Sequence, residues 1–165
     1  MVIETDRLTI RSFRESDIPA YAAIVADPEV MKFHGDGSPL SYEQAAAGVT
    51  GYIRSEARDG FSRYAVILRE TGELLGFCGL LRVDDGIDFG WRYASHAWGN
   101  GYATEAAAAV LDHGMNTLQL SGIFAGSALE NIGSVRVIQK IGMEFVTFDE
   151  HGGRKGVLYR QPSST

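Results

Sequence analysis

The sequence is poor in cysteine and in positive charge. Cys78 is the only cysteine among 165 residues, which excludes an intramolecular disulfide and a cysteine-rich zinc site and is typical of a protein from a reducing cytoplasm. Lysine and arginine number 15 against 21 acidic residues, the net charge is −6, and no basic run occurs. Because nucleic-acid binding requires a basic surface that neutralises phosphates, we expect no nonspecific nucleic-acid partner.

Long hydrophobic runs are missing as well. Glycine, arginine or aspartate interrupts every apolar stretch well before the roughly 20 residues that a membrane span needs, and the first residues carry charges at Glu4, Asp6 and Arg7. We therefore expect a cytoplasmic protein with neither a membrane span nor a secretion signal. The 45% of hydrophobic residues are enough for a sizeable core. The length predicts one domain over residues 1–160 and a flexible tail at 161–165, in a monomer or homodimer.

Hydrophobic periodicity and turn signals predict the element order βααβββαβαββ. Such an order indicates an α+β sandwich, with a mixed, mostly antiparallel central sheet and helices on both faces, rather than a doubly wound fold. The small residues of the helix that starts near Gly101 fall on one face, so this helix is expected to lie close to the sheet. The predicted strands are 2–13, 64–68, 74–83, 87–93, 123–125 and a hairpin of 145–148 with 156–159 around Gly152-Gly153. Four helices are predicted. The first is short, begins after Ser16 and ends at Asp27-Pro28, and a loop at 31–40 follows it. The others are 42–58, one that starts at Gly101, and 132–141.

Two glycines, Gly99 and Gly101, fall between a predicted strand and a predicted helix. In such a turn the backbone N–H groups and the helix N-terminus can stabilise a phosphate or pyrophosphate. The same glycines could simply make a tight turn, and both interpretations stay open. A dinucleotide-binding fingerprint is disfavoured because Thr104 stands where a third glycine is needed, and no Gly-Lys-Ser or Gly-Lys-Thr triplet provides a Walker loop.

Three segments in order carry a family resemblance: Gly90-Trp91, the stretch 98–106 (WGNGYATEA), and 131–143 (NIGSVRVIQKIGM). Together with the opening 3–11 (IETDRLTIR), they resemble the GNAT acetyltransferase superfamily, specifically its RimJ/RimL-like branch, over nearly the whole chain. The resemblance implies a GNAT-like fold and an acetyl-CoA-dependent N-acetyltransferase. Acetyl-CoA would be the cosubstrate, no metal would be needed, and the acetyl group would pass to an amine by direct attack in a ternary complex.

The resemblance also assigns residues to the cofactor. In the family, an Arg/Gln-x-x-Gly-x-Gly/Ala turn holds the pyrophosphate of coenzyme A. Trp98 departs from the basic or amide residue usual at the first position, so the phosphate contacts must rest on backbone N–H groups. The corresponding residues here are Trp98, Gly99, Asn100, Gly101, Tyr102, Ala103 and Thr104.

Two further segments correspond to the part of the family's site near the thioester. The strand Trp91, Arg92, Tyr93 matches the one whose main chain pairs with the pantetheine amides and polarises the thioester carbonyl. Asn131 and Ser134 match the polar pair near the pantetheine arm and its sulfur. Asn131 could equally be a helix cap, and Ser134 an ordinary hydroxyl on a helix surface.

Acetyl transfer to an amine requires two proton movements. A primary amine with a pKa of about 10 is mostly protonated at neutral pH, so a carboxylate, or a water that it holds, must accept a proton. Asp88 and Glu130 are the candidate bases, although either could be a solvated charge in a turn. Ser134 is the candidate proton donor to the departing thiolate.

The acceptor side is defined less sharply. His34 and Arg92 are candidates for bordering the acceptor pocket, although a lone loop histidine is usually only solvated. His96 and His113 lack the spacing of a metal pair, so no metal site is expected. The resemblance favours a protein or peptide N-terminus as the acceptor amine, and the negative net charge adds to this by attracting protonated amines. A small-molecule amine, or a noncatalytic acyl-CoA-binding sensor, remains the alternative.

Overall fold

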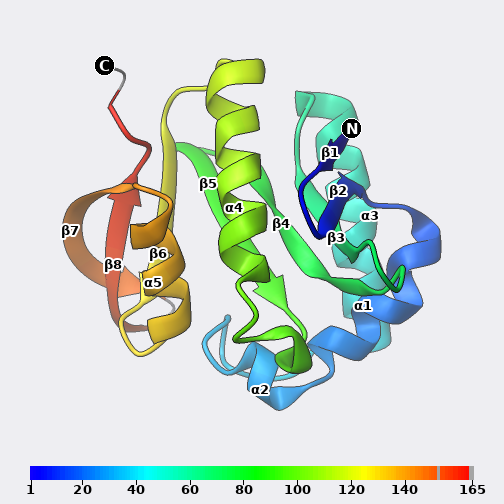
Figure 1. Cartoon of the computed structure of the whole chain (residues 1–165). Coiled ribbons are helices and arrows are strands. Elements are labelled where there is room, and N and C mark those ends of the chain that lie inside the picture. Colours follow the sequence, from blue (N-terminus) through cyan, green and yellow to red (C-terminus); the bar gives the residue numbers. More distant parts are fainter. Residues whose placement is uncertain (152, 164–165) are drawn as a thin grey trace.

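An eight-stranded sheet runs through the computed structural model, which describes residues 1–151 and 153–163. Neighbouring strands lie in the order β1-β2-β3-β4-β5-β6-β8-β7, and all pairs are antiparallel except β5 and β6, which are parallel (Figure 1). The predicted mixed, mostly antiparallel sheet is therefore confirmed. The strands are β1 (Val2–Glu4), β2 (Leu8–Ser12), β3 (Arg63–Leu68), β4 (Leu74–Val83), β5 (Gly86–Tyr93), β6 (Ile123–Ala128), β7 (Glu144–His151) and β8 (Arg154–Arg160).

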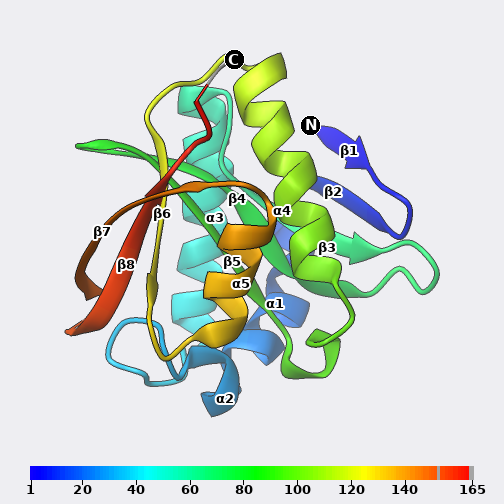
Figure 2. The same ribbon diagram turned by 60° about the vertical axis from the view of Figure 1, so that its left-hand side comes forward.

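Helices cover both faces of this sheet (Figure 2). One face carries α1 (Ile18–Val25) and α3 (Tyr42–Asp59), with the short α2 (Pro28–Met31) at one end. The other face carries α4 (Tyr102–Asp112), which continues into a π-helical turn at His113–Thr117, and α5 (Ile132–Lys140). Short 3-10 turns lie at Glu15–Asp17 and Ser95–Ala97. In the part of the chain that the structure describes, none of the helices has both the length and the apolar character needed to cross a bilayer.

The helix α4 lies close to the sheet because its inner face is small. Ala106, Ala107 and Val110 are fully buried, and a Cβ added at Gly114 would lie 2.9 Å from Leu80 Cδ1. A larger side chain at these positions would push the helix away from the strands. The small-residue face predicted from helical spacing is confirmed. On the opposite face, aromatic side chains fill the space under α1 and α3, namely Phe13, Tyr21, Tyr52 and Phe77.

One predicted strand was wrong, and one short helix was not predicted. The strand predicted over 2–13 is a hairpin of β1 and β2, joined by a turn in which the Thr5 N–H donates to Leu8 O at 3.0 Å. The turn residues Thr5, Asp6 and Arg7 include neither glycine nor proline, so the usual turn signals did not reveal it. Asp27-Pro28 does not only end a helix, because Asp27 accepts a hydrogen bond from Glu29 N at 2.9 Å and caps α2. The observed order is ββαααβββαβαββ.

The end of the chain is anchored at Gln161. Its N–H donates to Ile123 O at 2.8 Å, and its Oε1 accepts from Ile123 N at 2.8 Å. The domain boundary at 160 and the flexible tail at 161–165 stay predictions, and residues 164 and 165 lie outside the described residues. The predicted hairpin of β7 and β8 is confirmed, whereas Gly152, expected at its turn, also lies outside them.

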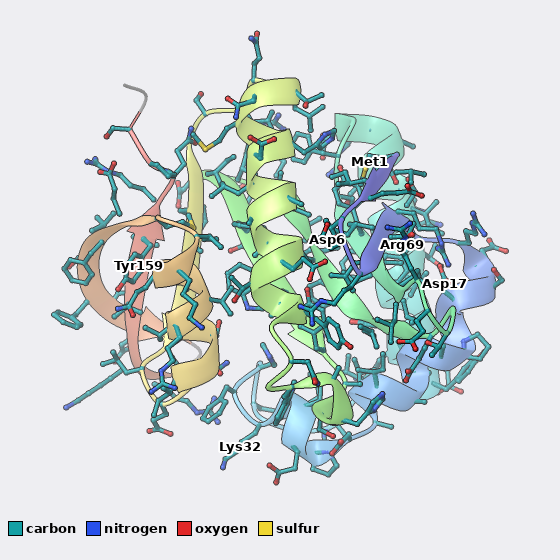
Figure 3. The ribbon with its side chains drawn as sticks, viewed as in Figure 1. Met1, Asp6, Asp17, Lys32, Arg69 and Tyr159 are labelled. Atoms are coloured by element: carbon teal, nitrogen blue, oxygen red, sulfur yellow. The ribbon has the colours of Figure 1, made fainter. Side chains whose placement is uncertain are left out.

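A buried ion pair ties β2 to the start of α1. Asp17, which is labelled in Figure 3, accepts at Oδ2 from Arg11 Nη1 at 2.8 Å and from Arg14 N at 2.8 Å, and at Oδ1 from Arg11 Nη2 at 2.9 Å. Burial alone would raise the pKa of Asp17, but the hydrogen bonds from Arg11 and Arg14 outweigh it and hold the pKa below its usual 3.8. The ionised carboxylate is therefore the form that the fold stabilises.

Replacing Asp17 by Asn should lower the free energy of unfolding by about 2–4 kcal/mol at neutral pH, because the partly buried Arg11 loses its charged partner. Because folding lowers the pKa of Asp17, this stabilisation is complete at pH values above the pKa of Asp17 in the unfolded state. It is lost as the pH falls through the pKa of Asp17 in the folded state. Urea unfolding at a series of pH values should show the difference from wild type shrinking below about pH 4. Asp85→Asn, in an exposed turn, is the control. A difference that stays constant into strong acid would contradict the role of this pair.

Candidate active site

The parallel strands β5 and β6 pair only near their starts. Their register joins Ile87 to Ile123 and Asp88 to Phe124, after which the strands diverge towards the end of the molecule that holds α2 (Figure 1). On its other side, β5 pairs with β4 along its whole length, while β6 gives its far edge to β8. Within the described residues, the main chain of 89–93 therefore has no strand partner on the side that faces the gap. Unpaired backbone groups of this kind need hydrogen bonds from another source.

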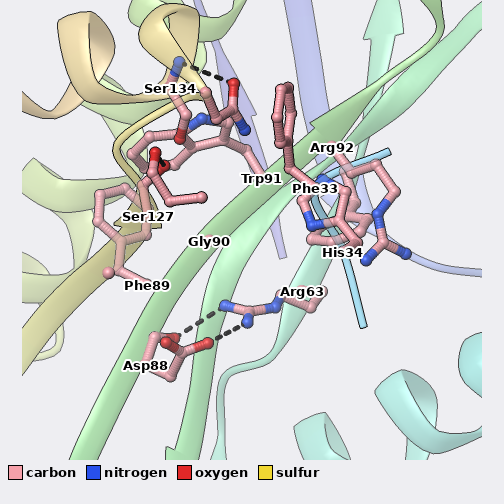
Figure 4. Close-up of a pocket in the computed structure, with 14 residues that line it drawn as sticks. Phe33, His34, Arg63, Asp88, Phe89, Gly90, Trp91, Arg92, Ser127 and Ser134 are labelled. Carbon is pink, nitrogen blue, oxygen red and sulfur yellow. Dashed lines mark hydrogen bonds and ion pairs between the residues drawn. The ribbon is translucent and has the colours of Figure 1, made fainter. Parts of the chain in front are cut away.

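A cavity of about 540 Å³ occupies this gap. A smaller cavity of about 120 Å³ adjoins it, lies nearer the sheet, and is shown in Figure 4. The larger cavity brings together every residue that the sequence assigned to the cofactor except Asn100. Those residues are Trp91, Arg92, Tyr93, Trp98, Gly99, Gly101, Tyr102, Ala103, Thr104, Asn131 and Ser134. The two cavities share Phe33, His34, Trp91, Arg92, Asn131 and Ser134.

The glycine turn presents free N–H groups to the larger cavity. Gly99 and Gly101 have φ of 76° and 81°, in the left-handed region that side chains with a Cβ disfavour. Gly101 is the N-cap of α4 and no side chain caps it, so the first helical bond runs from Glu105 N to Gly101 O at 3.1 Å. The N–H groups of residues 102–104 precede that bond and lie at the positive end of the helix dipole. This arrangement suits a phosphate.

Trp98 and Asn100 hold the turn in place. The Trp98 indole donates from Nε1 to Tyr93 O at 3.0 Å, which fixes the turn against the end of β5. The Asn100 amide donates to Ala97 O at 3.0 Å and to Trp98 O at 3.1 Å. Asn100 thus shapes the turn from behind and does not line either cavity.

Arg7, in the turn between β1 and β2, braces the same segment from outside. Its Nη1 donates to Asn100 O at 2.8 Å, its Nε donates to Glu105 Oε2 at 2.7 Å, and its guanidinium lies 4.5 Å from the ring centre of Tyr102. Glu105 Oε1 also accepts from Thr5 Oγ1 at 2.7 Å and from Arg7 N at 2.9 Å. The sequence analysis did not find this contact, because no local spacing connects positions so far apart in the chain.

Asn131 begins α5. Its Oδ1 accepts a hydrogen bond from Ser134 N at 3.4 Å, so the helix-cap interpretation is confirmed. The same side chain also lines both cavities, as does Ser134 (Figure 4). One short helix start therefore brings an amide and a hydroxyl to the point where the two cavities meet.

The candidate bases lie apart. Asp88 lines the smaller cavity and forms an ion pair with Arg63, whose Nη1 also donates to Gly79 O at 2.6 Å and to Asp88 O at 2.8 Å. Glycine at position 90 leaves room for this guanidinium, since a Cβ there would lie 3.0 Å from Arg63 Nη2. Glu130 is exposed, follows the end of β6, and lines the larger cavity. The sequence analysis missed Arg63; its only signal was an arginine at the start of an otherwise apolar strand.

Comparisons with known proteins decide the family. The family described as "Acetyltransferase (GNAT) domain" matches residues 7–144. The chain belongs to the GNAT acetyltransferase family. It is 34% identical over 145 residues to the "Uncharacterized N-acetyltransferase YnaD" of Bacillus subtilis (strain 168), covering 87% of this chain and 82% of that protein. The expected class, an acetyl-CoA-dependent N-acetyltransferase, is confirmed.

Solved structures show the same fold. A GNAT-family acetyltransferase from Bacillus anthracis superposes with a TM-score of 0.84 at 28% identity, covering 96% of each chain. The RimL ribosomal L7/L12 alpha-N-protein acetyltransferase, solved in complex with coenzyme A, superposes with a TM-score of 0.83 at 16% identity, again covering 96% of each chain. The resemblance of this acetyltransferase to the RimJ/RimL-like branch thus extends to the whole architecture.

The loop after α2 borders both cavities of the acetyltransferase. His34 and Arg92, the predicted acceptor residues, both line the two cavities, together with Phe33, which the sequence analysis did not single out. Arg154 Nη2 of β8 donates to Lys32 O at 3.0 Å and so ties this loop to the β7–β8 hairpin, beside which it lies in Figure 2.

Other reactive side chains of the acetyltransferase lie away from the cleft. Burial raises the pKa of the Cys78 thiol to about 12, so this fully buried cysteine stays protonated and does not act as a nucleophile. His96 is exposed and its Nε2 lies 2.6 Å from Glu73 Oε1. In residues 1–151 and 153–163, no three His, Cys, Asp or Glu side chains come together as a metal site would require.

Replacing Glu105 by Gln should lower the free energy of unfolding by about 1–2 kcal/mol, because an amide nitrogen would then face the N–H donors of Arg7. Urea unfolding and the thermal midpoint measure the change. Glu43→Gln is the matched control, since Glu43 is also an acid in the first turn of a helix, but is exposed. Equal stability of Glu105→Gln and wild type would show that the bracing contacts contribute nothing.

Proposed function

We propose that this enzyme acetylates a primary amine by direct attack of the amine on the thioester of acetyl-CoA, with both substrates held in the gap between β5 and β6. The observation that carries the proposal is the convergence of three features on one cavity. These are the unpaired main chain of β5, the uncapped N-terminus of α4 and the hydroxyl of Ser134. The unpaired main chain would hold the activated acyl group, the helix N-terminus would bind a phosphate, and the hydroxyl would protonate the leaving thiolate.

The residues present fit coenzyme A. The N–H groups of the turn from Gly101 to Thr104 would hold the pyrophosphate, and the main chain of Trp91, Arg92 and Tyr93 would pair with the pantetheine amides. Trp98, Gly99 and Asn100, which precede these N–H groups, and the side chains of Tyr102 and Ala103 would shape this site. When bound, acetyl-CoA supplies the acetyl group as a thioester. Asn131 would orient the pantetheine arm, and Ser134 would donate a proton to the departing thiolate.

The Arg63 ion pair bears on which carboxylate removes the proton from the amine. Asp88 already shares its charge with Arg63, which donates to Oδ2, whereas Glu130 has no ion-pair partner among the described residues. A base that is free to accept is the better candidate. We therefore favour Glu130, acting directly or through a water, over Asp88.

The resemblance favours a protein or peptide N-terminus as the acceptor, but one observation favours a small amine. The bond from Arg154 to Lys32 O holds the loop of Phe33 and His34 against the β7–β8 hairpin, and the cavity beneath measures about 120 Å³. That volume has room for a compact amine and not for several residues of a peptide. His34 and Arg92 would border this amine in either case.

Replacing Gly101 by Glu should weaken acetyl-CoA binding by at least roughly tenfold, because it adds a negative charge to the turn that is proposed to hold the phosphate and places a Cβ 3.3 Å from Arg7 Nη2, which braces that turn. Calorimetric titration with acetyl-CoA measures the affinity. Gly60→Glu is the matched control: Gly60 has φ of 82° and ends α3, so it carries the same backbone strain away from the cleft. Unchanged affinity in a folded Gly101→Glu protein would show that the phosphate site is misplaced.

Replacing Ser134 by Ala should lower kcat by roughly 100-fold while leaving acetyl-CoA affinity nearly intact, because the hydroxyl acts only when the thiolate departs. The backbone N–H that Asn131 caps is retained in this variant. Release of free CoA at saturating substrate measures kcat, and Ser55→Ala on α3 is the control. Equal rates for Ser134→Ala and wild type would reject the assignment.

A further inference from the structure

Arg92 has a distinctive position in the wall of the smaller cavity. Its guanidinium lies over the ring of Phe77, 5.2 Å from the ring centre, and Nη1 donates to Tyr21 Oη at 3.1 Å. Its Nε is buried and has no hydrogen-bond partner. Figure 4 shows the guanidinium beside the loop that carries Phe33 and His34.

No acidic group neutralises this guanidinium. Among the described residues, no carboxylate lies within ion-pair distance of Arg92, although Glu29 and Glu130 line the larger cavity from exposed positions. Burial raises the pKa of Tyr21 well above its ordinary value, so this hydroxyl stays neutral at physiological pH. Arg92 therefore faces the cavity as an uncompensated positive charge.

Arg63 provides an internal comparison. Its guanidinium also lies against Phe77, 5.6 Å from the ring centre, but Asp88 pairs with it. The wall of the smaller cavity thus contains two guanidiniums and one carboxylate. The two cations of α5, Arg136 and Lys140, line only the larger cavity and do not alter this balance.

An uncompensated, half-buried guanidinium is costly to desolvate, and an anionic ligand that reaches it relieves this cost. Its planar fork matches a carboxylate or a phosphate. Arg92 lines the smaller cavity together with Asn131 and Ser134, which are proposed to act at the thioester, whereas the glycine turn proposed for the pyrophosphate lines only the larger one. An anion that Arg92 holds in the smaller cavity would therefore belong to the same molecule as the attacking amine.

We infer that Arg92 binds an anionic group of the acceptor, so that the acceptor is a compact amine that carries a carboxylate or a phosphate near its nitrogen. This inference rests on the proposed acetylation of an amine and names the class of that amine. A free amino acid, a phosphorylated amine and the N-terminus of an acidic peptide share this chemistry. The small volume of the cavity, about 120 Å³, favours the free small molecules.

The test uses pairs of amines that differ only in the anionic group. They are β-alanine with β-alaninamide, phenylalanine with phenylalaninamide, phosphoethanolamine with ethanolamine, and peptides that begin Ala-Asp or Ala-Asn. Release of free CoA gives kcat/KM for each amine. With the wild-type enzyme, the anionic member of at least one pair should be preferred by roughly 10- to 100-fold. An amide has the less basic amine, so a preference for the acid cannot arise from a larger fraction of free amine.

Arg92→Gln should reduce this preference to within about twofold, mainly through a higher KM for the anionic member. Arg92→Lys keeps the positive charge but lacks the planar guanidinium, so it should retain part of the preference. It also tests the inference if the glutamine variant does not fold. Arg54→Gln, which removes an exposed arginine of α3 that lines neither cavity, should retain all of it. Calorimetry should show acetyl-CoA affinity within a few-fold of wild type in each variant.

Equal use of both members of every pair by the wild-type enzyme would overturn the inference, as would a preference that survives in Arg92→Gln. In either case, CoA release would still support the proposed function. A preference confined to the peptides would support an acidic N-terminus as the source of the anion. Failure of every amine to release CoA would contradict the proposed function and, with it, the inference.

Discussion

The divergence of two parallel strands is the constraint from which the site follows. Where β6 leaves β5 after Asp88, the backbone of 89–93 keeps hydrogen-bonding groups that the sheet does not use. Such groups are costly to bury without partners, so the gap is suited to a ligand with amides of its own. Regular structure fixes the divergence, because β4 holds one side of β5 and β8 takes the far edge of β6. The cleft therefore does not depend on a mobile loop.

Arg63 stabilises the sheet next to this gap and decides the chemistry of its wall. Its bonds to Gly79 O and Asp88 O join β3 to β4 and β5, and its ion pair occupies the Asp88 carboxylate. Two consequences follow. In the proposed mechanism, proton removal falls to a group outside the ion pair, and among the described residues the second guanidinium against Phe77, that of Arg92, is left without an acidic partner.

The sequence predicted the parts of the fold that rest on local periodicity. The small face of α4, the meander of β3 to β5 and the two glycines of positive φ all follow from spacing or from a single residue type. The contacts that depend on register could not be predicted. Arg63 meets Asp88 only because β4 sets the alignment of β3 and β5 on its two sides, and Arg7 meets Glu105 only because the β1–β2 turn packs beside the start of α4. The turn at Thr5 was missed because it contains neither glycine nor proline.

The bracing of the glycine turn resolves an electrostatic conflict at the start of α4. Glu105 lies in the first turn, where a negative charge stabilises the helix but would also compete with a phosphate for the same N–H groups. Arg7 and Thr5 engage both carboxylate oxygens from the outer side. The negative charge of Glu105 is thereby neutralised, and the N–H groups that precede the first helical bond stay available. With Trp98 in place of the family's basic or amide residue, those N–H groups are what the turn offers to an anion.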